Sequence, residues 1–562
     1  WFMTQTIYFP PGEYLVSDTL LPVNPQNAEQ SRPYIRFLGA GQDKTVIRLV
    51  DRAPGFGDRS SPKAVVQTGN SYVRGSGLPN SGYNNYIEHL TIDVGENNPG
   101  AVGVRFDVAN IGAMEHVTIR SRDRREPGVF GLQFHHVCGI GYVHDLRVEG
   151  FEYGIHFDQT AVNNIVLEDL ELVGQGRAGL YNGGKNIQVL GLHSINEVPG
   201  LVMEHPWAAT VLVEGTFESP DRTRGPAIDL RGPGFLYARD IRSEGYESLI
   251  KTPPDSDVEG VDNPALSEWL SHGPVTEGMV SLDLPIRDRP EFYDPDFNNW
   301  ANVENYGATP GDDTNDDAIG IQAAIDSGKE TVYLPWGRYT IKSPIYVRGD
   351  VRRIDGLFSR LIAGAQDAAI NFEDMDGDFV ILENFIARGM PIVHRSNATV
   401  SIVNRGQGGV IRSEEQATGN LFVTNCGPHI KLEIRGGINA WCRAVNRERT
   451  SLLNDGSTLW YFGDNVERMY VQAQNRITTE PVKTINHGKT EFLGGAIDAL
   501  PYVHPESLGA LIEVEQGSKV SATYASEDRK KDGVMGTWHL HVLDENQPHD
   551  KQRVRQEDAF TV

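Results

Sequence analysis

The sequence predicts an all-β chain made of two right-handed parallel β-helices in tandem. Three observations carry this prediction. A short motif occurs twice, an apolar pattern recurs with a period in the twenties, and 562 residues are too many for one hydrophobic core. We expect a first helix at residues 1–250, a linker at 251–300 and a second helix at 301–562, with a cleft between the two helices.

The duplicated motif marks the start of each helix. Residues 8–14 read YFPPGEY and residues 333–339 read YLPWGRY, an offset of 325 (333 − 8) with four of seven positions identical. Before the second copy, acidic residues 312–317 lead into AIGIQAAIDSG. This pattern predicts an aspartate-capped helix rather than a calcium loop, because the spacing of an EF-hand is missing. We expect Ile319, Ala323 and Ile325 on its apolar face. Almost nothing precedes the first copy, so we expect that an upstream segment was removed.

The recurring pattern in the first half is apolar, two residues, apolar, one residue, apolar. Alternation with period two is typical of a strand with one buried face, and a repeat in the twenties is typical of a solenoid coil. Leucine-rich repeats carry more Leu and a regular Asn, and propeller blades need about 40 residues. A parallel β-helix therefore fits best. The triplets are Ile87/Leu90/Ile92, Met114/Val117/Ile119, Val143/Leu146/Val148, Leu167/Leu170/Leu172, Ile187/Leu190/Leu192 and, more weakly, Leu212/Gly215/Phe217.

Composition restricts the partners. The formal net charge of −25 opposes binding to nucleic acid and to anionic membranes, and favours a neutral polymer. No apolar run reaches the roughly 18 residues of a membrane span, and no signal peptide is visible. Of the three cysteines, Cys138, Cys426 and Cys442, we expect buried free thiols rather than a disulfide between the last two. No zinc spacing is present, and His135 and His136 should face opposite sides of a strand, so we expect no metal and no cofactor. We also expect a monomer.

Carboxylates and aromatic residues are densest at residues 439–467. Glu448 and Glu467 are 19 residues apart (467 − 448), close to one coil, so they should be axial neighbours. Such pairing raises the pKa of one carboxyl group, as a general acid requires, and aromatic rings stack on sugars. Salt bridges with nearby arginines are the structural alternative. The residues that we expect to bind substrate are Trp441, Trp460, Tyr461, Arg443, Asn446 and, in a weaker cluster, Trp207.

The motifs resemble the pectate-lyase-like β-helix superfamily, and the tandem arrangement is similar to glycoside hydrolase family 55, the inverting exo-β-1,3-glucanases. Residues 459–470 resemble the segment that holds the general acid of that family, which implies Glu467 as the acid. Residues 103–110 and 138–146 resemble its water-binding region, with Asn110 in place of Gln and Cys138 or Gly139 in place of Ser.

The resemblance implies a secreted or periplasmic, inverting glycoside hydrolase that acts on a β-1,3-glucan-like polysaccharide without a metal. Two candidates for the base stay open, Glu448 and a water held by Asn110. Two other functions also stay open: a polysaccharide lyase acting on a uronate polymer, and a non-catalytic glycan-binding β-helix.

Overall fold

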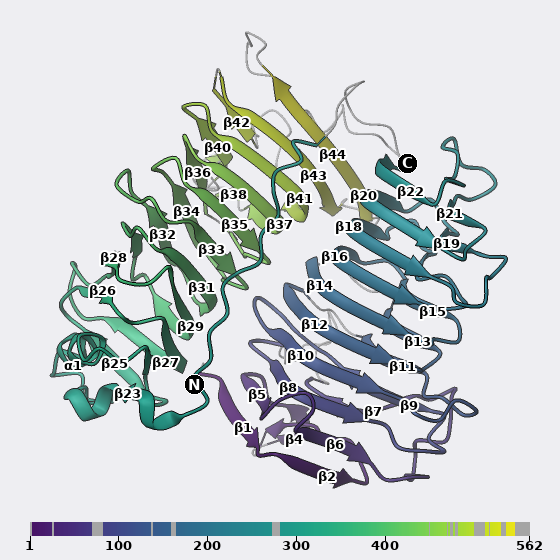
Figure 1. Ribbon diagram of the computed structural model, residues 1–562, viewed down its shortest axis with the longest axis horizontal. Coiled ribbons are helices and arrows are strands. Elements are labelled where there is room, and N and C mark those ends of the chain that lie inside the picture. The colour runs from purple at the N-terminus through teal and green to yellow at the C-terminus, as the bar shows by residue number, and fades with distance from the viewer. Residues whose placement is uncertain are drawn as a thin grey trace. The chain divides into compact units, whose positions relative to one another are not determined.

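The computed structural model divides into two compact units, Phe2–Gly273 and Pro274–Val562 with Trp1. Each unit is a solenoid of parallel strands (Figure 1), so the predicted fold class is confirmed for both halves of the chain. The boundary lies inside the range predicted as a linker. The structure describes residues 3–24, 27–69, 82–135, 139–158, 164–271, 281–448, 450–468, 470–471, 476–477, 482–499, 512–515, 517–529 and 535–545.

The N-terminal unit has two long sheets. The twelve-stranded sheet has the order β1-β5-β8-β10-β12-β14-β16-β18-β20-β22, with β2 and β6 beside it. Its strands are β1 (Gln5–Phe9), β2 (Gly12–Val16), β5 (Ile35–Gly39), β6 (Thr45–Leu49), β8 (Tyr86–Asp93), β10 (Ala113–Arg120), β12 (Gly141–Glu149), β14 (Asn164–Val173), β16 (Asn186–Ile195), β18 (Ala209–Glu218), β20 (Phe235–Glu244) and β22 (Ala265–Leu270). The eight-stranded sheet consists of β7 (Lys63–Gln67), β9 (Ala101–Arg105), β11 (Phe130–Phe134), β13 (Tyr153–Phe157), β15 (Ala178–Asn182), β17 (Leu201–Met203), β19 (Pro226–Leu230) and β21 (Ser248–Lys251). A small hairpin joins β3 (Val23–Asn24) and β4 (Asn27–Ser31).

The C-terminal unit repeats this plan. Its twelve-stranded sheet consists of β23 (Trp300–Asn302), β24 (Thr331–Tyr333), β25 (Arg338–Ile341), β27 (Arg353–Ala363), β29 (Phe379–Arg388), β31 (Thr399–Gly406), β33 (Leu421–Thr424), β35 (Asn439–Arg443), β37 (Thr458–Arg468), β41 (Lys489–Ala499), β43 (Lys519–Arg529) and β44 (Met535–Glu545). Its eight-stranded sheet consists of β26 (Ile345–Gly349), β28 (Ile370–Met375), β30 (Ile392–His394), β32 (Gly409–Ser413), β34 (Ile430–Ile434), β36 (Leu452–Asp455), β40 (Val482–Ile485) and β42 (Ile512–Val514). Two short strands, β38 (Tyr470–Val471) and β39 (Arg476–Ile477), pair with each other.

The register confirms most of the predicted coils and corrects one. Met114 aligns with Ile87 on one side and with Val143 on the other, as the pattern predicted. On β16, however, the residues that align with the preceding triplet are Val189, Leu192 and Ser194. The polar Ser194 occupies a position that is apolar on the two neighbouring coils (Leu172 and Phe217), and this substitution shifted the predicted triplet by two residues.

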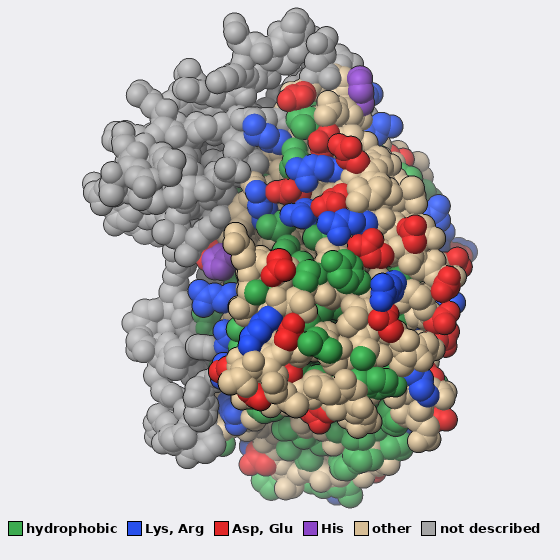
Figure 2. Space-filling view, turned by 90° about the vertical axis from the view of Figure 1, so that its left-hand side faces the viewer, with side chains coloured by type: hydrophobic (Ala, Val, Ile, Leu, Met, Phe, Trp, Pro, Cys, Tyr) green, Lys and Arg blue, Asp and Glu red, His purple; other side chains and the backbone are tan. Residues whose placement is uncertain are grey.

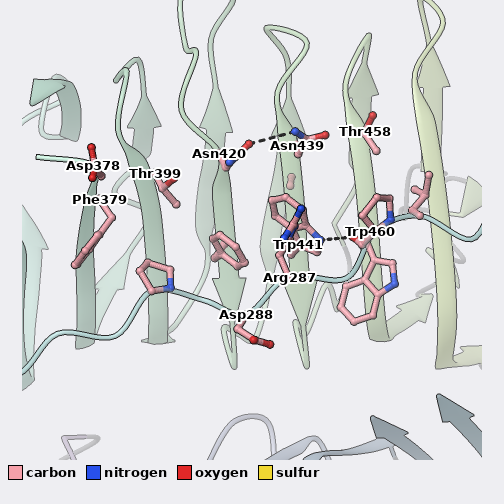
Figure 3. Close-up of a pocket in the computed structure, with 15 residues that line it drawn as sticks. Arg287, Asp288, Asp378, Phe379, Thr399, Asn420, Asn439, Trp441, Thr458 and Trp460 are labelled. Atoms are coloured by element: carbon pink, nitrogen blue, oxygen red, sulfur yellow. Dashed lines mark hydrogen bonds between the residues drawn. The ribbon is translucent and has the colours of Figure 1, made fainter. Parts of the chain in front are cut away.

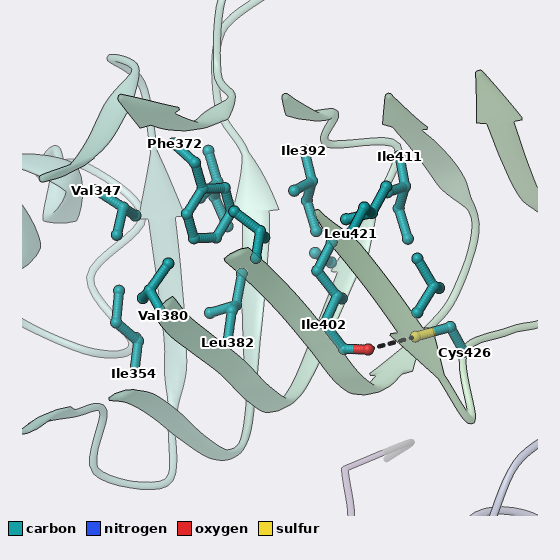
Figure 4. Packing of buried hydrophobic residues seen from close by; sticks show 14 of the residues in the cluster. Val347, Ile354, Phe372, Val380, Leu382, Ile392, Ile402, Ile411, Leu421 and Cys426 are labelled. Carbon is teal, nitrogen blue, oxygen red and sulfur yellow. Dashed lines mark hydrogen bonds between the residues drawn. The ribbon is translucent and has the colours of Figure 1, made fainter. Parts of the chain in front are cut away.

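Each solenoid encloses its own apolar core. Figure 4 shows part of the C-terminal core, where residues of successive coils stack along the axis. Cys426 and Cys442 are buried free thiols, as predicted, whereas Cys138 lies outside the described residues. The Cys426 thiol donates to the carbonyl oxygen of Ile402 at 3.7 Å, and burial raises its pKa to about 12. These thiols are therefore packing groups rather than nucleophiles.

The duplicated motif forms the same turn in both units. Tyr14 donates its hydroxyl to the Pro10 carbonyl oxygen at 2.9 Å, and Tyr339 donates to that of Pro335 at 2.7 Å. A hydroxyl from the next coil donates to the same carbonyl oxygen in each unit, from Thr45 at 3.2 Å and from Ser359 at 2.9 Å. The two copies are thus equivalent in structure as well as in sequence.

The acidic stretch caps a helix, as predicted. Asp316 accepts a hydrogen bond from the Ala318 amide at the start of α1 (Asp317–Ile325). The predicted apolar face is wrong, because Ile319 is 68% exposed and Ile321 is the isoleucine that packs into the core with Ile325. The two short 3-10 helices, η1 (Phe297–Asn299) and η2 (Val303–Tyr306), precede this helix.

The outer face of the eight-stranded sheet in the C-terminal unit carries a ladder of ion pairs. Arg395 lies 2.7 Å from Glu414 and 3.3 Å from Glu373, and the pattern continues with Lys431 beside Glu433 at 3.0 Å. Figure 2 shows such a face, with acidic and basic side chains interspersed. These side chains are partly exposed, and solvent-accessible pairs of this kind add little stability. No helix among the described residues is long and apolar enough to cross a membrane.

Candidate functional site

A groove lies on the outer face of the twelve-stranded sheet in the C-terminal unit. Because side chains alternate along a strand, Asn439 and Trp441 of β35 both point outward. The parallel register repeats this arrangement on neighbouring coils and produces two rows. The aromatic row consists of Phe422, Trp441 and Trp460. The polar row, two residues earlier in each strand, consists of Thr399, Asn420, Asn439 and Thr458.

Residues 281–293, here called the strap, run across this face. At the last coils, the Leu282 amide donates to Ser521 Oγ at 3.1 Å. The amides of Asp283 and Leu284 donate to the two carboxylate oxygens of Glu491, each at 3.0 Å. Glu491 is fully buried, so these backbone donors help to satisfy a carboxylate that water does not reach.

The strap is then held by two side chains predicted to bind substrate. Trp441 Nε1 donates to the Pro285 carbonyl oxygen at 2.8 Å, and an Arg443 guanidinium nitrogen donates to that of Arg287 at 2.6 Å. Trp441 is 6% exposed and Arg443 is 1% exposed. Both residues therefore fix the strap, and Trp441 also keeps part of its ring on the groove.

Between the strap and the sheet lies a cavity of about 540 Å³ (Figure 3), which is within the range of small-molecule pockets. Besides the two rows, its lining includes Asp288 of the strap, and Asp378 and Phe379 at the edge of β29. Asn439 donates to the side-chain oxygen of Asn420 at 3.3 Å, which ties two members of the polar row together.

The groove offers the groups that sugars need. Ring faces stack on the apolar faces of sugars, and amides and hydroxyls exchange hydrogen bonds with sugar hydroxyls. Trp460 is 1% exposed, and its Nε1 has no acceptor among the described residues. The Arg443 guanidinium lies 5.0 Å from the centre of the Trp460 ring. A buried indole donor without an acceptor is suited to a ligand oxygen.

Trp441→Phe should loosen the strap while it keeps an aromatic ring on Phe422, which is stacked on Trp441 at 4.9 Å. Loss of one hydrogen bond should lower the free energy of unfolding by about 1 kcal/mol. It should also speed amide exchange at residues 282–287, measured by mass spectrometry. Trp300→Phe is the matched control, because Trp300 Nε1 donates to the Asp294 carbonyl oxygen at 3.0 Å. Equal exchange at 282–287 in both variants would contradict the role of Trp441.

Glu448 and Glu467 lie on neighbouring coils. β35 pairs with β37 at an offset of 19 residues, and the bridge between Asn446 and Asn465 keeps this offset two residues before the glutamates. Glu448 lies in a turn just beyond this bridge, and Glu467 lies within β37. Glu448 is half-buried, and its carbonyl oxygen lies 2.8 Å from Nδ1 of His429. The side chain of Glu467 lies outside the described part of the structure, so its catalytic role stays a prediction.

Two residues predicted to contact substrate lie inside the solenoid. Tyr461 follows the outward Trp460 and therefore points into the core, where its hydroxyl donates to the Val445 carbonyl oxygen at 3.2 Å. Asn446 is 1% exposed, and its side-chain oxygen accepts from Asn465 at 3.2 Å and from the Glu448 amide at 3.0 Å. Both side chains support the coil corners, so neither lines the groove.

Asn110 and Trp207 belong to the N-terminal unit. Asn110 has a left-handed backbone (φ 65°), and its amide donates to the Gly139 carbonyl oxygen at 3.2 Å. Trp207 is 39% exposed and lies edge-to-face with His205 at 4.9 Å. The predicted roles of Asn110 and Trp207 in substrate binding stay predictions.

Sequence reasoning missed the strap and the polar row. The strap has no strand pattern, and its proline and aspartate content indicated only a linker held at the surface. The polar row had a signal, because alternation in Asn439-Ala440-Trp441 puts both outer residues on one face. Asp288 and Asp378 carried no such signal.

Comparison with known proteins agrees with the fold. Residues 3–196 and 300–353 match the family model described as rhamnogalacturonase A/epimerase, pectate lyase-like, which confirms the resemblance to the pectate-lyase-like superfamily. None of the curated proteins is a significant match.

Two solved structures similar to the chain are of sacteLam55A from Streptomyces sp. SirexAA-E. One has 12% identity and a TM-score of 0.42, and covers 94% of this chain and 87% of that one. A variant in complex with glucose has 13% identity and a TM-score of 0.42, with 96% and 92% covered. The A-module of the mannuronan C-5 epimerase AlgE6 from Azotobacter vinelandii has 11% identity and a TM-score of 0.15, with 92% and 90% covered. At these identities and TM-scores the similarities bear on neither the substrate nor the site residues.

Proposed function

We propose that this chain is a glycoside hydrolase that acts on a neutral β-glucan polysaccharide. The groove carries the proposal, because a row of aromatic rings lies beside a row of amides and hydroxyls along the solenoid axis. A net charge of −25 disfavours acidic polymers, which points to a neutral substrate. A polysaccharide substrate in turn favours action outside the cytoplasm.

In this proposal Glu467 is the general acid. It protonates the glycosidic oxygen while the bond to the anomeric carbon breaks, and an activated water attacks that carbon from the opposite face. The attacking water gives its proton to Glu448 or, where Asn110 only orients the water, to bulk solvent. The configuration at the anomeric carbon is then inverted. The resemblance of residues 459–470 to the family segment and the one-coil spacing of the two glutamates support this assignment.

The substrate in this proposal is long. Along β37, Glu467 lies seven residues after Trp460 in the groove, which is about 23 Å at the rise of an extended strand. A single sugar at the groove is therefore distant from the acid. The groove would hold part of the polymer that is remote from the cleaved bond.

Asn439→Ala tests the groove. It should weaken binding of a neutral β-glucan polymer roughly three- to tenfold, because one or two hydrogen bonds to sugar hydroxyls are lost. Turnover of a short aryl glycoside should not change. Asn315→Ala removes an exposed asparagine outside the groove and should change neither value. Affinity electrophoresis on polysaccharide gels would measure polymer binding, and initial rates would measure turnover of the aryl glycoside. Unchanged polymer binding in Asn439→Ala would remove the groove from the proposal.

A further inference from the structure

Two side-chain ladders run along the outer face of the twelve-stranded sheet in the N-terminal unit, on β8, β10, β12 and β14. The register aligns the first ladder, Glu88, Glu115, His144 and Glu168. The next residue in each strand forms the second ladder, His89, His116, Asp145 and Asp169, all with left-handed backbones. The same conformation recurs at Glu214 and Asp240 on later coils, so it belongs to the coil corner. The ability of these ladders to bind a ligand therefore depends on their histidine and carboxylate side chains and not on the backbone conformation.

At the centre of the ladders three metal-ligating side chains converge. The carboxylate of Glu115 and one ring nitrogen each of His116 and His144 lie within 4.8 Å of one another. Glu115 is 5% exposed, and both imidazoles are half-buried. One carboxylate and two imidazoles are a common ligand set of catalytic zinc sites, in which the fourth position holds water.

Each imidazole is oriented by a second carboxylate. His116 Nδ1 lies 2.7 Å from Asp145 Oδ2, and His144 Nε2 lies 3.1 Å from Asp169 Oδ2. In His144 the opposite nitrogen, Nδ1, is left to act as a ligand. Metal-binding histidines almost always donate their other N–H group to a carboxylate or carbonyl oxygen, which fixes the tautomer and the ring direction.

His144 supplies the second, independent observation. Its Nδ1 is buried and has no hydrogen-bond partner among the described residues. It lies 3.9 Å from Glu115 Oε2, which is too long for a hydrogen bond. Two ligand atoms at 2.0–2.1 Å from a tetrahedral zinc ion are roughly 3.4 Å apart, so a small inward shift fits an ion between them.

The two glutamates that flank the cluster along the first ladder interact with other residues. Glu88 pairs with the buried guanidinium of Arg36, and Glu168 accepts a hydrogen bond from the Tyr142 hydroxyl at 2.6 Å. The candidate site is therefore limited to three ligands and their two supporting aspartates.

We propose that Glu115, His116 and His144 form a zinc-binding site, with Asp145 and Asp169 as its positioning residues. The ligands come from neighbouring strands, and the site lies in the N-terminal unit, outside the groove. It does not depend on the glycoside hydrolase function.

The test uses the full chain after treatment with a chelator, titrated with zinc sulfate alone by isothermal calorimetry. We expect one equivalent of zinc per chain. Substitution by cobalt(II) should give the strong visible absorption of a tetrahedral site. Asp169→Asn should weaken zinc binding roughly 10- to 100-fold, because it removes a positioning carboxylate. Asp169 is half-exposed, so this variant should fold even if His144→Gln does not.

His144→Gln should abolish stoichiometric binding, and circular dichroism would confirm that the variant is folded. His156→Gln is the control, because His156 lies 2.8 Å from Asp158 in the other sheet of the same unit. It should bind zinc like the parent chain. Absence of a stoichiometric zinc site in the parent chain would overturn the proposal. Equal zinc binding in His144→Gln, or equal loss in His156→Gln, would overturn it as well.

Discussion

Glu467→Gln should lower turnover on a β-glucan with a natural leaving group by about 10²-fold or more, because the departing oxygen loses its proton donor. On an activated aryl glycoside the loss should be much smaller, since that leaving group departs without protonation. Steady-state rates on the two substrates give the comparison directly. Glutamine is nearly isosteric with glutamate, so the fold should persist.

The leaving-group comparison separates a general acid from a residue that only supports the site. Damage to substrate binding would lower both rates alike. Glu448→Gln is the matched variant on the neighbouring coil. If Glu448 is the base, its loss should be similar on both substrates, since water must be activated in each case. Full activity of Glu467→Gln, or equal losses on both substrates, would move the acid to another residue.

Arg447→Met should destabilise the C-terminal unit by about 3–5 kcal/mol, because it breaks a buried ion pair. Arg447 Nε donates to Asp464 Oδ1 at 2.9 Å, and a second guanidinium nitrogen pairs with the other carboxylate oxygen. The two side chains are 1% and 0% exposed, so water cannot replace the lost partner. Chemical denaturation followed by tryptophan fluorescence measures the change.

The double variant Arg447→Met/Asp464→Leu is the control for this prediction. It removes both charges together and should lose less stability than Arg447→Met alone, since no carboxylate is left without its guanidinium. A loss below about 1 kcal/mol for Arg447→Met would contradict the prediction, because a loss of that size is typical of an exposed salt bridge.

The fold was largely predictable because its signals are local and repeated. The turn at Tyr14 recurs at Tyr339 with the same hydrogen bond. The repeated motif in the sequence therefore correctly predicted two equivalent turns in the structure. Coil register was predictable wherever all three inward positions were apolar. It failed at Ser194, where one polar residue in the core broke the pattern.

The candidate sites were predictable only in part, because they depend on contacts between distant segments. The strap reaches Trp441 across 156 residues, a separation that no local pattern encodes. The cluster at His116 and His144 likewise joins neighbouring coils, whereas motif reasoning tested spacing along the chain. Tyr461 shows the converse case. Tyr461 follows the outward Trp460, so strict alternation of side chains along the strand predicts that Tyr461 points into the core, where the structure has it.

The most direct test of the central proposal is a product analysis with neutral β-glucans and uronate polymers as separate substrates. We expect shorter saturated sugars from a neutral β-glucan, with inverted anomeric configuration in the first minutes by NMR. Products bearing an unsaturated uronate would show a lyase and contradict the proposal. Tight β-glucan binding without any cleavage would contradict it equally, and would favour a non-catalytic glycan-binding solenoid.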